Sequence, residues 1–172
     1  MKISYRKLGP ADAGQYRAIR LESLKLHPDS FGSSYEEQRE LPKLMFEKAL
    51  KAPVDDRFVM GAFEQEALIG ICGFIPFIAD EYQALRPAGT LIQMYVRPAY
   101  RGRKIGLGLV KALMHEAFSL PNIDHIVLEV TEGNMGAIRV YEQAGFLTYQ
   151  ADGRPADINK TGTRTMIIRR GD

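Results

Sequence analysis

Hydrophobic and polar positions alternate in several short segments of the chain, and this period of two predicts β-strands. The segment 2–8 alternates and stops at Gly9-Pro10, which is a turn signal. The apolar segments 57–63 and 67–78 flank a Glu-Gln-Glu turn and predict a β-hairpin. Further strands are expected at 90–96, 125–130, 145–150 and 163–170.

Other segments carry apolar residues at a helical period. The strongest pattern is 105–118, where an apolar residue recurs every fourth position at Ile105, Leu109, Leu113 and Ala117. Helices are also predicted at 11–26, 41–51 and 134–143, whereas 28–40 and 151–162 are interpreted as loops. Strands that form hairpins and also alternate with helices predict one mixed sheet covered by helices, an α/β or α+β domain.

The composition is that of an ordinary soluble globular protein, with 45% apolar and 26% charged residues. The length of 172 residues predicts a single domain, 1–172. A formal charge of +2 is too small to predict nucleic-acid or membrane binding, so neither partner is expected. Cys72 is the only cysteine, which excludes an internal disulfide and indicates a reducing compartment. No apolar run is long enough for a membrane span or a signal core, so we expect a cytoplasmic protein.

The segment 95–114, YVRPAYRGRKIGLGLVKALM, joins a predicted strand to the strongest predicted helix through a basic loop that contains glycine. The first amides of a helix have no internal partner, and the helix dipole favours negative charge there. Arg101, Arg103 and Lys104 would oppose this dipole unless an anion is bound. A pyrophosphate cradle and a solvated basic turn both fit this segment by itself. The chain contains neither a P-loop nor a Gly-x-Gly-x-x-Gly motif, which disfavours an NAD-dependent oxidoreductase.

Two motifs lie within 91–146, about a third of the chain. The first is a strand that ends in Val-x-Pro at 96–98 and is followed by the basic loop and helix start. The second is Asn-x-x-Ala-x-x-x-Tyr-x-x-x-Gly-Phe, which is matched at Asn134, Ala137, Tyr141, Gly145 and Phe146. In order and spacing the pair closely resembles the GNAT superfamily of acetyl-CoA-dependent N-acetyltransferases. The resemblance implies the GNAT fold, a mixed, mostly antiparallel sheet of about six to seven strands flanked by about four helices.

The resemblance also implies acetyl-CoA as the cofactor, with its pyrophosphate on backbone amides between Arg101 and Leu109. Aligned from Arg101, Lys104 stands where the family has its first glycine, while Gly106 and Gly108 keep the next small-residue positions. Aligned from Arg103, both glycines fit but the helix begins two residues late, so we prefer the first register. The implied cofactor-binding residues are Met94, Tyr95, Val96, Arg101, Gly102, Arg103, Lys104, Gly106, Leu107, Gly108, Asn134, Ala137 and Tyr141.

By the same resemblance, Tyr141 is the general acid that protonates the departing thiolate. A neutral phenol can do so, because an ordinary tyrosine titrates near pH 10 and a thiol near 8.5. Read alone, such a tyrosine would more often be a core residue. The amide of Met94 is implied to polarise the acetyl oxygen, and the pantetheine arm to pair with the strand edge at Met94 and Val96. Asn134 is implied to contact that arm, and its residue type also suits a helix N-cap.

The sequence leaves the identity of the general base open. Glu129 is a carboxylate in a strand that should be apolar on both faces if it is central, and it is a candidate base or anchor for the amine. Gln93 is the equivalent polar residue on the preceding strand and could bind substrate or order a water. A solvent-facing position at a sheet edge or end explains both residues as well. The family also uses water chains as the base.

The expected reaction is transfer of an acetyl group to a primary amine, by direct transfer in a ternary complex. We favour a small-molecule amine, because no long groove-forming insertion is evident. The alternatives are a protein or peptide acceptor, at an N-terminus or lysine, and a regulatory domain that binds acyl-CoA without chemistry. The three histidines do not cluster with cysteine or carboxylates at metal-ligand spacing, so no metal is expected. A homodimer is compatible with the family resemblance.

Overall fold

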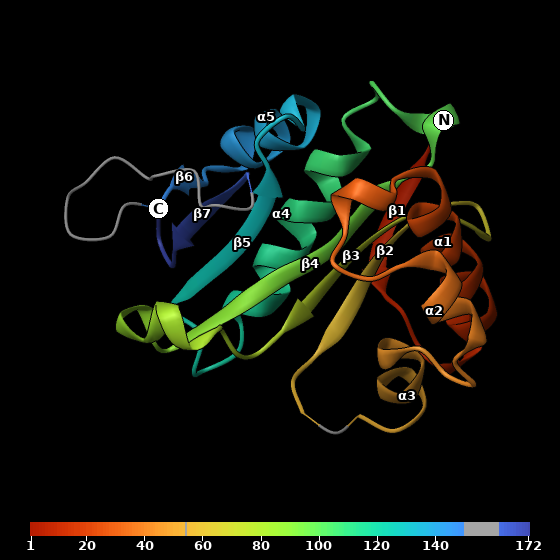
Figure 1. Ribbon diagram of the computed structural model, residues 1–172, viewed down its shortest axis with the longest axis horizontal. Helices are drawn as coiled ribbons and strands as arrows, with labels where there is room; N and C mark the ends of the chain where they lie inside the picture. The colour runs from red at the N-terminus through yellow and green to blue at the C-terminus, as the bar shows by residue number, and fades with distance from the viewer. Residues whose placement is uncertain (54, 150–161) are drawn as a thin grey trace.

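Seven strands form one open, mixed sheet in the order β1-β2-β3-β4-β5-β7-β6 (Figure 1). The computed structural model describes residues 1–53, 55–149 and 162–172. Only β4 and β5 pair in parallel, and the other neighbours are antiparallel. The strands are β1 (Ile3–Lys7), β2 (Phe58–Glu64), β3 (Ala67–Ile75), β4 (Ala88–Val96), β5 (His125–Thr131), β6 (Leu147–Thr148) and β7 (Thr163–Arg169).

Helices cover both faces of this sheet. They are α1 (Ala13–Leu26), α2 (Tyr35–Glu40), α3 (Met45–Lys51), α4 (Ile105–Phe118) and α5 (Met135–Ala144). Short 3-10 turns add η1 (Pro10–Asp12), η2 (Pro28–Ser30), η3 (Asp80–Leu85) and η4 (Pro98–Tyr100). Helices α1 to α3 lie on one face, over the half of the sheet that contains β1 to β4, and α4 lies on the other face beside α5 (Figure 1). None of the helices in the described residues combines the length and apolarity needed to cross a membrane.

The sheet separates two hydrophobic clusters. One packs α4 and α5 against the sheet, and it contains Ile105, Leu109, Leu113 and Ala117, each at most 2% exposed. The other packs α1 and α3 against the opposite face. Cys72 is fully buried in the first cluster, as its apolar strand predicts. Burial of these apolar stripes from both sides fixes the sheet as the middle layer of the domain.

The predicted strands and helices are confirmed in type and order, with one wrong assignment. The segment 28–40 was interpreted as a loop, but its second half forms α2. The hydroxyl of Ser34 accepts a hydrogen bond from the amide of Glu37 at 3.2 Å and so caps this helix. The helix is only six residues long and buries none of them, so it has no apolar stripe that a periodicity reading could detect. The loop expected at 151–162 lies, apart from its last residue, outside the described residues.

Candidate active site

Strands β4 and β5 pair at one end and separate at the other. Their parallel pairing covers only Ala88 to Thr90 on β4 and His125 to Val127 on β5. Beyond this point β4 continues to pair with β3, as far as Val96, and β5 continues to pair with β7, as far as Thr131. The two strands therefore diverge, as Figure 1 shows, and leave facing edges without a strand partner. An extended ligand can add itself to such an edge.

A β-bulge lies in β4 at the start of the gap. Ile71 of β3 pairs with Tyr95 and Gly73 pairs with Ile92, so Gln93 and Met94 together stand opposite Cys72. Gln93 has a φ of 57°, a left-handed conformation that is unusual for a residue with a side chain. Its side-chain oxygen accepts a hydrogen bond from the phenol of Tyr16 on α1, at 2.7 Å. This hydrogen bond anchors the bulge to α1, which covers one face of the sheet.

The bulge sets the direction of the backbone groups that follow it. The amide of Arg97 donates to the carbonyl oxygen of Ile69 on β3, at 2.9 Å. Because amide directions alternate along a regular strand, the amide of Tyr95 also faces β3, whereas that of Val96 faces the gap. The carbonyl oxygen of Val96 on this side accepts the Nε–H of Arg101 at 3.3 Å. The part of β4 that contains Met94 and Val96 therefore has an edge without a strand partner, where we expect the pantetheine arm to pair.

The loop before α4 presents a row of free amides. The amides of residues 102–107 donate to no acceptor within the described residues, and the first intrahelical bond comes from the amide of Gly108 to Lys104 O at 3.0 Å. Gly102 and Lys104 have φ values of 75° and 59°, so left-handed residues alternate with ordinary ones in the loop. Such an alternation turns successive amides toward one point and forms an anion-binding nest. The arrangement fits a pyrophosphate at the positive end of the helix dipole.

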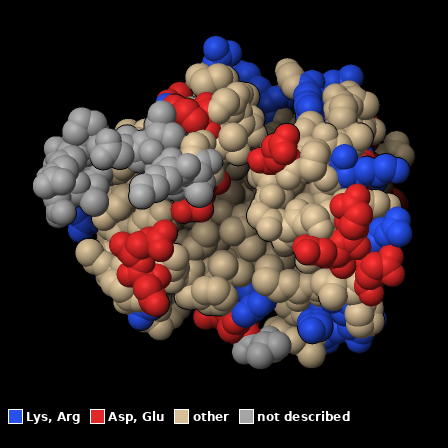
Figure 2. All heavy atoms as spheres, viewed as in Figure 1, with Lys and Arg blue, Asp and Glu red and all other residues tan. Residues whose placement is uncertain are grey.

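The basic side chains of this loop differ in their contacts. The guanidinium of Arg101 donates a hydrogen bond to Val96 O and lies 2.7 Å from the Nε2 of His27. Arg103 lies over the ring of Tyr100, at 5.8 Å from the centroid. Lys104 is exposed and has no carboxylate partner among the described residues. Basic side chains gather along the upper edge of Figure 2, where α4 begins in Figure 1, and they supply a positive field around the nest.

The two predicted loop glycines face different neighbours. A Cβ on Gly106 would lie 2.9 Å from the Cε of Met94 and 3.8 Å from the side chain of Val140. Position 106 therefore faces the space between β4 and α5. A Cβ on Gly108 would lie 2.2 Å from the phenol oxygen of Tyr5 on β1. Gly106 thus borders the gap. Gly108 allows β1 to pack closely on α4, which is a structural requirement that the motif alone does not reveal.

Helix α5 forms the far wall of the gap. Asn134 caps the helix, as predicted, because its side-chain oxygen accepts the amide of Ala137 at 3.2 Å. Tyr141 is 5% exposed, and its ring packs edge-on against Phe146 with 5.9 Å between the centroids. The turn ends at Gly145, whose φ of 104° requires glycine. The second motif therefore fixes the position of Tyr141 at both ends of the helix.

Tyr141 is a buried residue, and its phenol oxygen makes no hydrogen bond within the described residues. Burial raises its pKa above the ordinary value, and the nearby Cys72 thiol raises it further. Cys72 lies opposite the bulge of β4, and it shares with Tyr141 the buried cluster that packs α4 and α5 on the sheet. Helix α5 thus contributes a protonated donor that has no partner among the described residues.

Glu129 lies on β5 beyond the parallel pairing and is exposed. Its carboxylate accepts a hydrogen bond from the phenol of Tyr82 at 2.9 Å, and the same phenol contacts the hydroxyl of Thr165 at 2.9 Å. Val127, two residues earlier, faces the cluster of Ile78 and η3, so Glu129 faces that side of the sheet as well. Glu129 and Gln93 therefore belong to the face opposite α4.

Figure 2 shows a hollow on this face, between the part of the molecule that carries α1 and α2 and the part that carries β5 and β7. The η2 turn reaches over it. The carbonyl oxygen of Asp29 accepts the hydroxyl of Thr131 on β5 at 3.4 Å. On the other side, His27 contacts Arg101 and stacks at a tilt on Tyr95, with 5.9 Å between the ring centroids. The η2 turn therefore connects the end of β5 with the loop that precedes α4.

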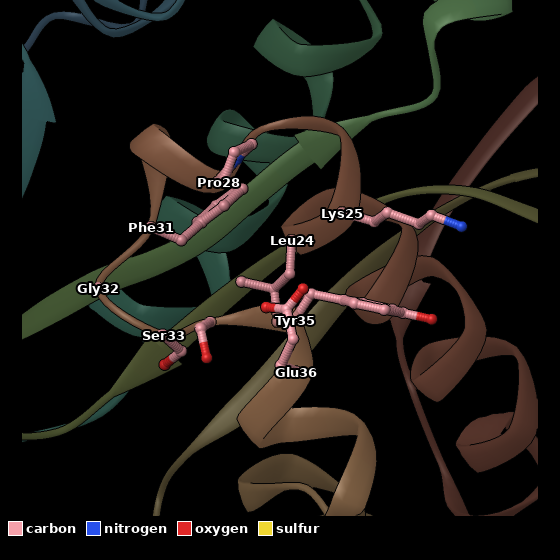
Figure 3. A pocket seen from close by; sticks show the side chains of 9 residues that line it. Leu24, Lys25, Pro28, Phe31, Gly32, Ser33, Tyr35 and Glu36 are labelled. Atoms are coloured by element: carbon pink, nitrogen blue, oxygen red, sulfur yellow. The ribbon is translucent and has the colours of Figure 1, made fainter.

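A cavity of about 330 Å³ lies beside the hollow, between the C-terminal part of α1 and the segment that leads into α2 (Figure 3). Leu24 and Phe31 contribute apolar surface to its wall. The ring of Phe31 also lies 4.7 Å over the guanidinium of Arg20, a buried residue of α1. Sequence reasoning did not identify Tyr16, Arg20 or Tyr82 as site residues. Their contacts join segments far apart in the chain, and no local signal marks them.

Comparison with known proteins decides the family. The model of the acetyltransferase (GNAT) family matches residues 20–146, which contain the gap, the amide nest and Tyr141. The chain belongs to the GNAT acetyltransferase family. Its members use acetyl-CoA, and the free amides of 102–107 fit the pyrophosphate of this cofactor. No group of three metal-ligating side chains is found in the part of the chain that the structure describes.

Solved GNAT structures share the whole architecture. A GNAT-family acetyltransferase from Streptococcus pneumoniae is 19% identical with a TM-score of 0.71, covering 98% of this chain and 99% of its own. The PaiA N-acetyltransferase from Thermoplasma acidophilum, solved in complex with coenzyme A, is 23% identical with a TM-score of 0.69 and the same coverage. A ribosomal-protein-alanine N-acetyltransferase from Brucella melitensis is 18% identical with a TM-score of 0.68, covering 96% of this chain and 99% of its own. These likenesses confirm the GNAT fold with its seven-stranded sheet.

Proposed function

We propose that this acetyltransferase moves the acetyl group of acetyl-CoA to the primary amine of a small molecule, by direct transfer in a ternary complex. The observation that carries the proposal is the phenol of Tyr141. Tyr141 is a buried residue whose phenol has a raised pKa and no hydrogen-bond partner among the described residues, and it packs in the same cluster as Cys72, which lies opposite the bulge of β4. A group with these properties is a proton donor held ready for a leaving group.

We assign a residue of this chain to each step of the transfer. The amine nitrogen bonds to the carbonyl carbon of the thioester, and the Met94 amide stabilises the negative charge that develops on the oxygen. As the carbon–sulfur bond breaks, Tyr141 gives its proton to the thiolate. An ammonium acceptor first gives one proton to a base, from which it passes to solvent. The second proton, lost after the nitrogen has bonded, restores the phenol directly or through water, so that one proton is released for each ammonium consumed. Asn134 and the edge at Met94 and Val96 hold the cofactor in place.

Glu129 is our candidate for binding the incoming ammonium or accepting its proton. It is an exposed carboxylate on the face where the hollow lies, and it accepts a hydrogen bond from Tyr82, whose phenol also contacts the hydroxyl of Thr165. Gln93 is committed to Tyr16, and its side-chain amide nitrogen makes no hydrogen bond within the described residues. This nitrogen is free to bind the substrate or a water. The two polar residues of β4 and β5 thus belong to the acceptor side.

A small acceptor is favoured by the η2 turn. The turn is held between Thr131 and the His27–Arg101 contact, so it restricts the approach of a long chain from that end. Protein acceptors remain an alternative, because the Brucella neighbour of the same fold is named for a ribosomal protein. The intact Tyr141 argues against a domain that binds acyl-CoA without catalysis.

The test is release of free CoA thiol from acetyl-CoA across amino acids, polyamines, aminoglycosides and short peptides. We expect release with one class of small amine and its loss in Tyr141→Phe. Release with peptides or proteins alone would overturn the small-molecule assignment. Saturable acetyl-CoA binding without release from any amine would support the regulatory alternative.

A further inference from the structure

Arg20 is a buried cation without a counter-ion. Its side chain is 4% exposed, and it forms no ion pair within the described residues. The Nε–H has no hydrogen-bond partner, and one Nη atom reaches only Ser23 Oγ, at the long distance of 3.5 Å. Burying an unpaired charge costs several kcal/mol. The fold therefore maintains an unfavourable group that the hydrophobic core does not need.

Two carboxylates on α1 and α3 are engaged elsewhere. Glu47 pairs with Arg17 at 2.9 Å and also accepts the amide of Leu44. Glu22, on α1 itself, pairs with Arg97 at 3.2 Å and accepts the phenol of Tyr95 at 2.8 Å. Arg20 is not a member of either cluster. Its charge is left available for an anion that is not part of the described chain.

The position of Arg20 connects it to the site. It lies one helical turn after Tyr16, close enough for its charge to lower the pKa of that phenol against the larger effect of burial. Tyr16 in turn holds Gln93 at the bulge, beside the amide proposed to polarise the acetyl group. Phe31 covers the guanidinium from the segment that follows η2. The guanidinium thus lies on the acceptor side of the sheet, away from the basic loop that suits the pyrophosphate.

We propose that Arg20 binds a carboxylate of the acceptor, so that the substrate is an amino acid or another small amine that carries a carboxylate. This inference rests on the proposed function and specifies its substrate class. A carboxylate suits the site because it brings one negative charge to one guanidinium and can accept two parallel hydrogen bonds. A phosphate monoester carries between one and two charges at neutral pH, and Arg20 alone would leave part of this charge uncompensated.

The test uses matched pairs of acceptors. Amino acids are compared with their carboxamides, in which the anion is replaced by a neutral group of similar size, and O-phosphoethanolamine serves as the phosphate arm. We expect wild-type kcat/KM to be about tenfold or more higher for the acid than for the amide, mainly through KM. Arg20→Gln should remove this preference without changing the Kd of acetyl-CoA. Lys48→Gln, which removes an exposed cation from α3 on the same face, should retain it.

A binding measurement separates this inference from the proposed function. N-acetyl amino acids and their N-acetyl amides are titrated into the protein in the presence of CoA, which requires no turnover. Binding of the acids alone, lost in Arg20→Gln, would support the inference even if no acetyl transfer were detected. Equal binding of acids and amides, binding of neither, or a preference that survives Arg20→Gln would overturn it. Preference for O-phosphoethanolamine would replace the carboxylate by a phosphate.

The stability of the free protein gives a third readout. If Arg20 served only the fold, Arg20→Met would lower the melting temperature. If it is an unpaired binding group, the same variant should melt at the wild-type temperature or above it, because a costly buried charge is removed. A clear loss of stability in Arg20→Met, together with unchanged acid preference in Arg20→Gln, would assign the residue to the fold.

Discussion

The phenol of Tyr16 donates a hydrogen bond of 2.7 Å to the side-chain oxygen of Gln93, across 77 positions of sequence. This contact joins α1 to the one residue of β4 with left-handed backbone. We expect the bulge that Gln93 begins to turn the amide of Met94 toward the gap between β4 and β5. A helix on the acceptor side thereby supports the backbone group that we expect to polarise the acetyl oxygen.

Removing this support should affect both stability and catalysis. In Tyr16→Phe the oxygen of Gln93 loses its partner, so we expect the free energy of unfolding to fall by about 1–3 kcal/mol. Turnover should fall by roughly tenfold because the Met94 amide is less firmly oriented. Urea denaturation followed by circular dichroism and a thiol-release assay measure the two effects.

The matched control for Tyr16→Phe is Tyr100→Phe. This change removes another phenol, which donates to Glu64 at 2.7 Å outside the gap. It should cost some stability without changing turnover. Equal turnover in wild type and Tyr16→Phe would show that the bulge keeps its geometry without α1.

The role of Tyr141 predicts a separation of binding from chemistry. Tyr141→Phe keeps the ring that packs on Phe146 and removes only the proton donor. We expect kcat to fall by roughly 10²-fold or more, with the Kd of acetyl-CoA unchanged in calorimetry. Tyr35→Phe, which removes a half-buried phenol on α2, is the control and should leave both values unchanged. Wild-type turnover in Tyr141→Phe would assign the proton to another donor.

The same residue predicts a pH profile. Burial raises the pKa of Tyr141 above its ordinary value near 10, so the phenol keeps its proton throughout the neutral and mildly alkaline range. A group with a raised pKa is active below that pKa and loses its proton only as the pH rises through it. Wild-type kcat should therefore show no alkaline decline between about pH 7 and 9.5. A decline of kcat within this range would show that an acid other than Tyr141 controls the reaction.

Regular local patterns made much of the fold predictable. Helix α4 begins and ends at the predicted residues, because its apolar residues recur every fourth position and all become buried. The cap at Asn134 and the glycine at Gly145 mark both ends of α5 in the sequence. The motif around Tyr141 therefore led to the correct family and to a wall of the gap.

Other features depend on contacts that no local pattern contains. The bulge at Gln93 results from a one-residue mismatch between β3 and β4, and the divergence of β4 from β5 results from where their pairing stops. Arg20 belongs to the buried stripe of α1, where an arginine is unexpected and its lack of a carboxylate is visible only in three dimensions. A sequence reading detects residue types and spacing, but it does not detect the absence of a partner.

The position of Gly106 predicts a loss of cofactor binding. A side chain there would enter the space between Met94 and Val140, next to the free amides of the loop. Gly106→Glu adds bulk and a negative charge where a pyrophosphate is expected. We therefore expect no binding of acetyl-CoA, even when acetyl-CoA is present at millimolar concentration. Gly14→Glu adds the same group to the first turn of α1, where a Cβ meets nothing within 4 Å, and should bind normally. Tight binding of acetyl-CoA by Gly106→Glu would overturn the assignment of this loop.

Lys104 gives a prediction about stability that is independent of catalysis. It stands where the family has glycine, and its φ of 59° is left-handed rather than helical, which costs a residue with a side chain about 1–2 kcal/mol. Lys104→Gly should therefore raise the free energy of unfolding by about 0.5–1 kcal/mol, after the greater flexibility of glycine in the unfolded chain is subtracted. The loop amide is retained, so the Kd of acetyl-CoA should rise only a few-fold through loss of one charge.

Gln65→Gly, at a φ of 54° in the turn between β2 and β3, should give the same stabilisation with no change in Kd. If Lys104→Gly instead destabilised the protein while Gln65→Gly stabilised it, the lysine side chain would be what holds the loop, because backbone strain is common to both positions.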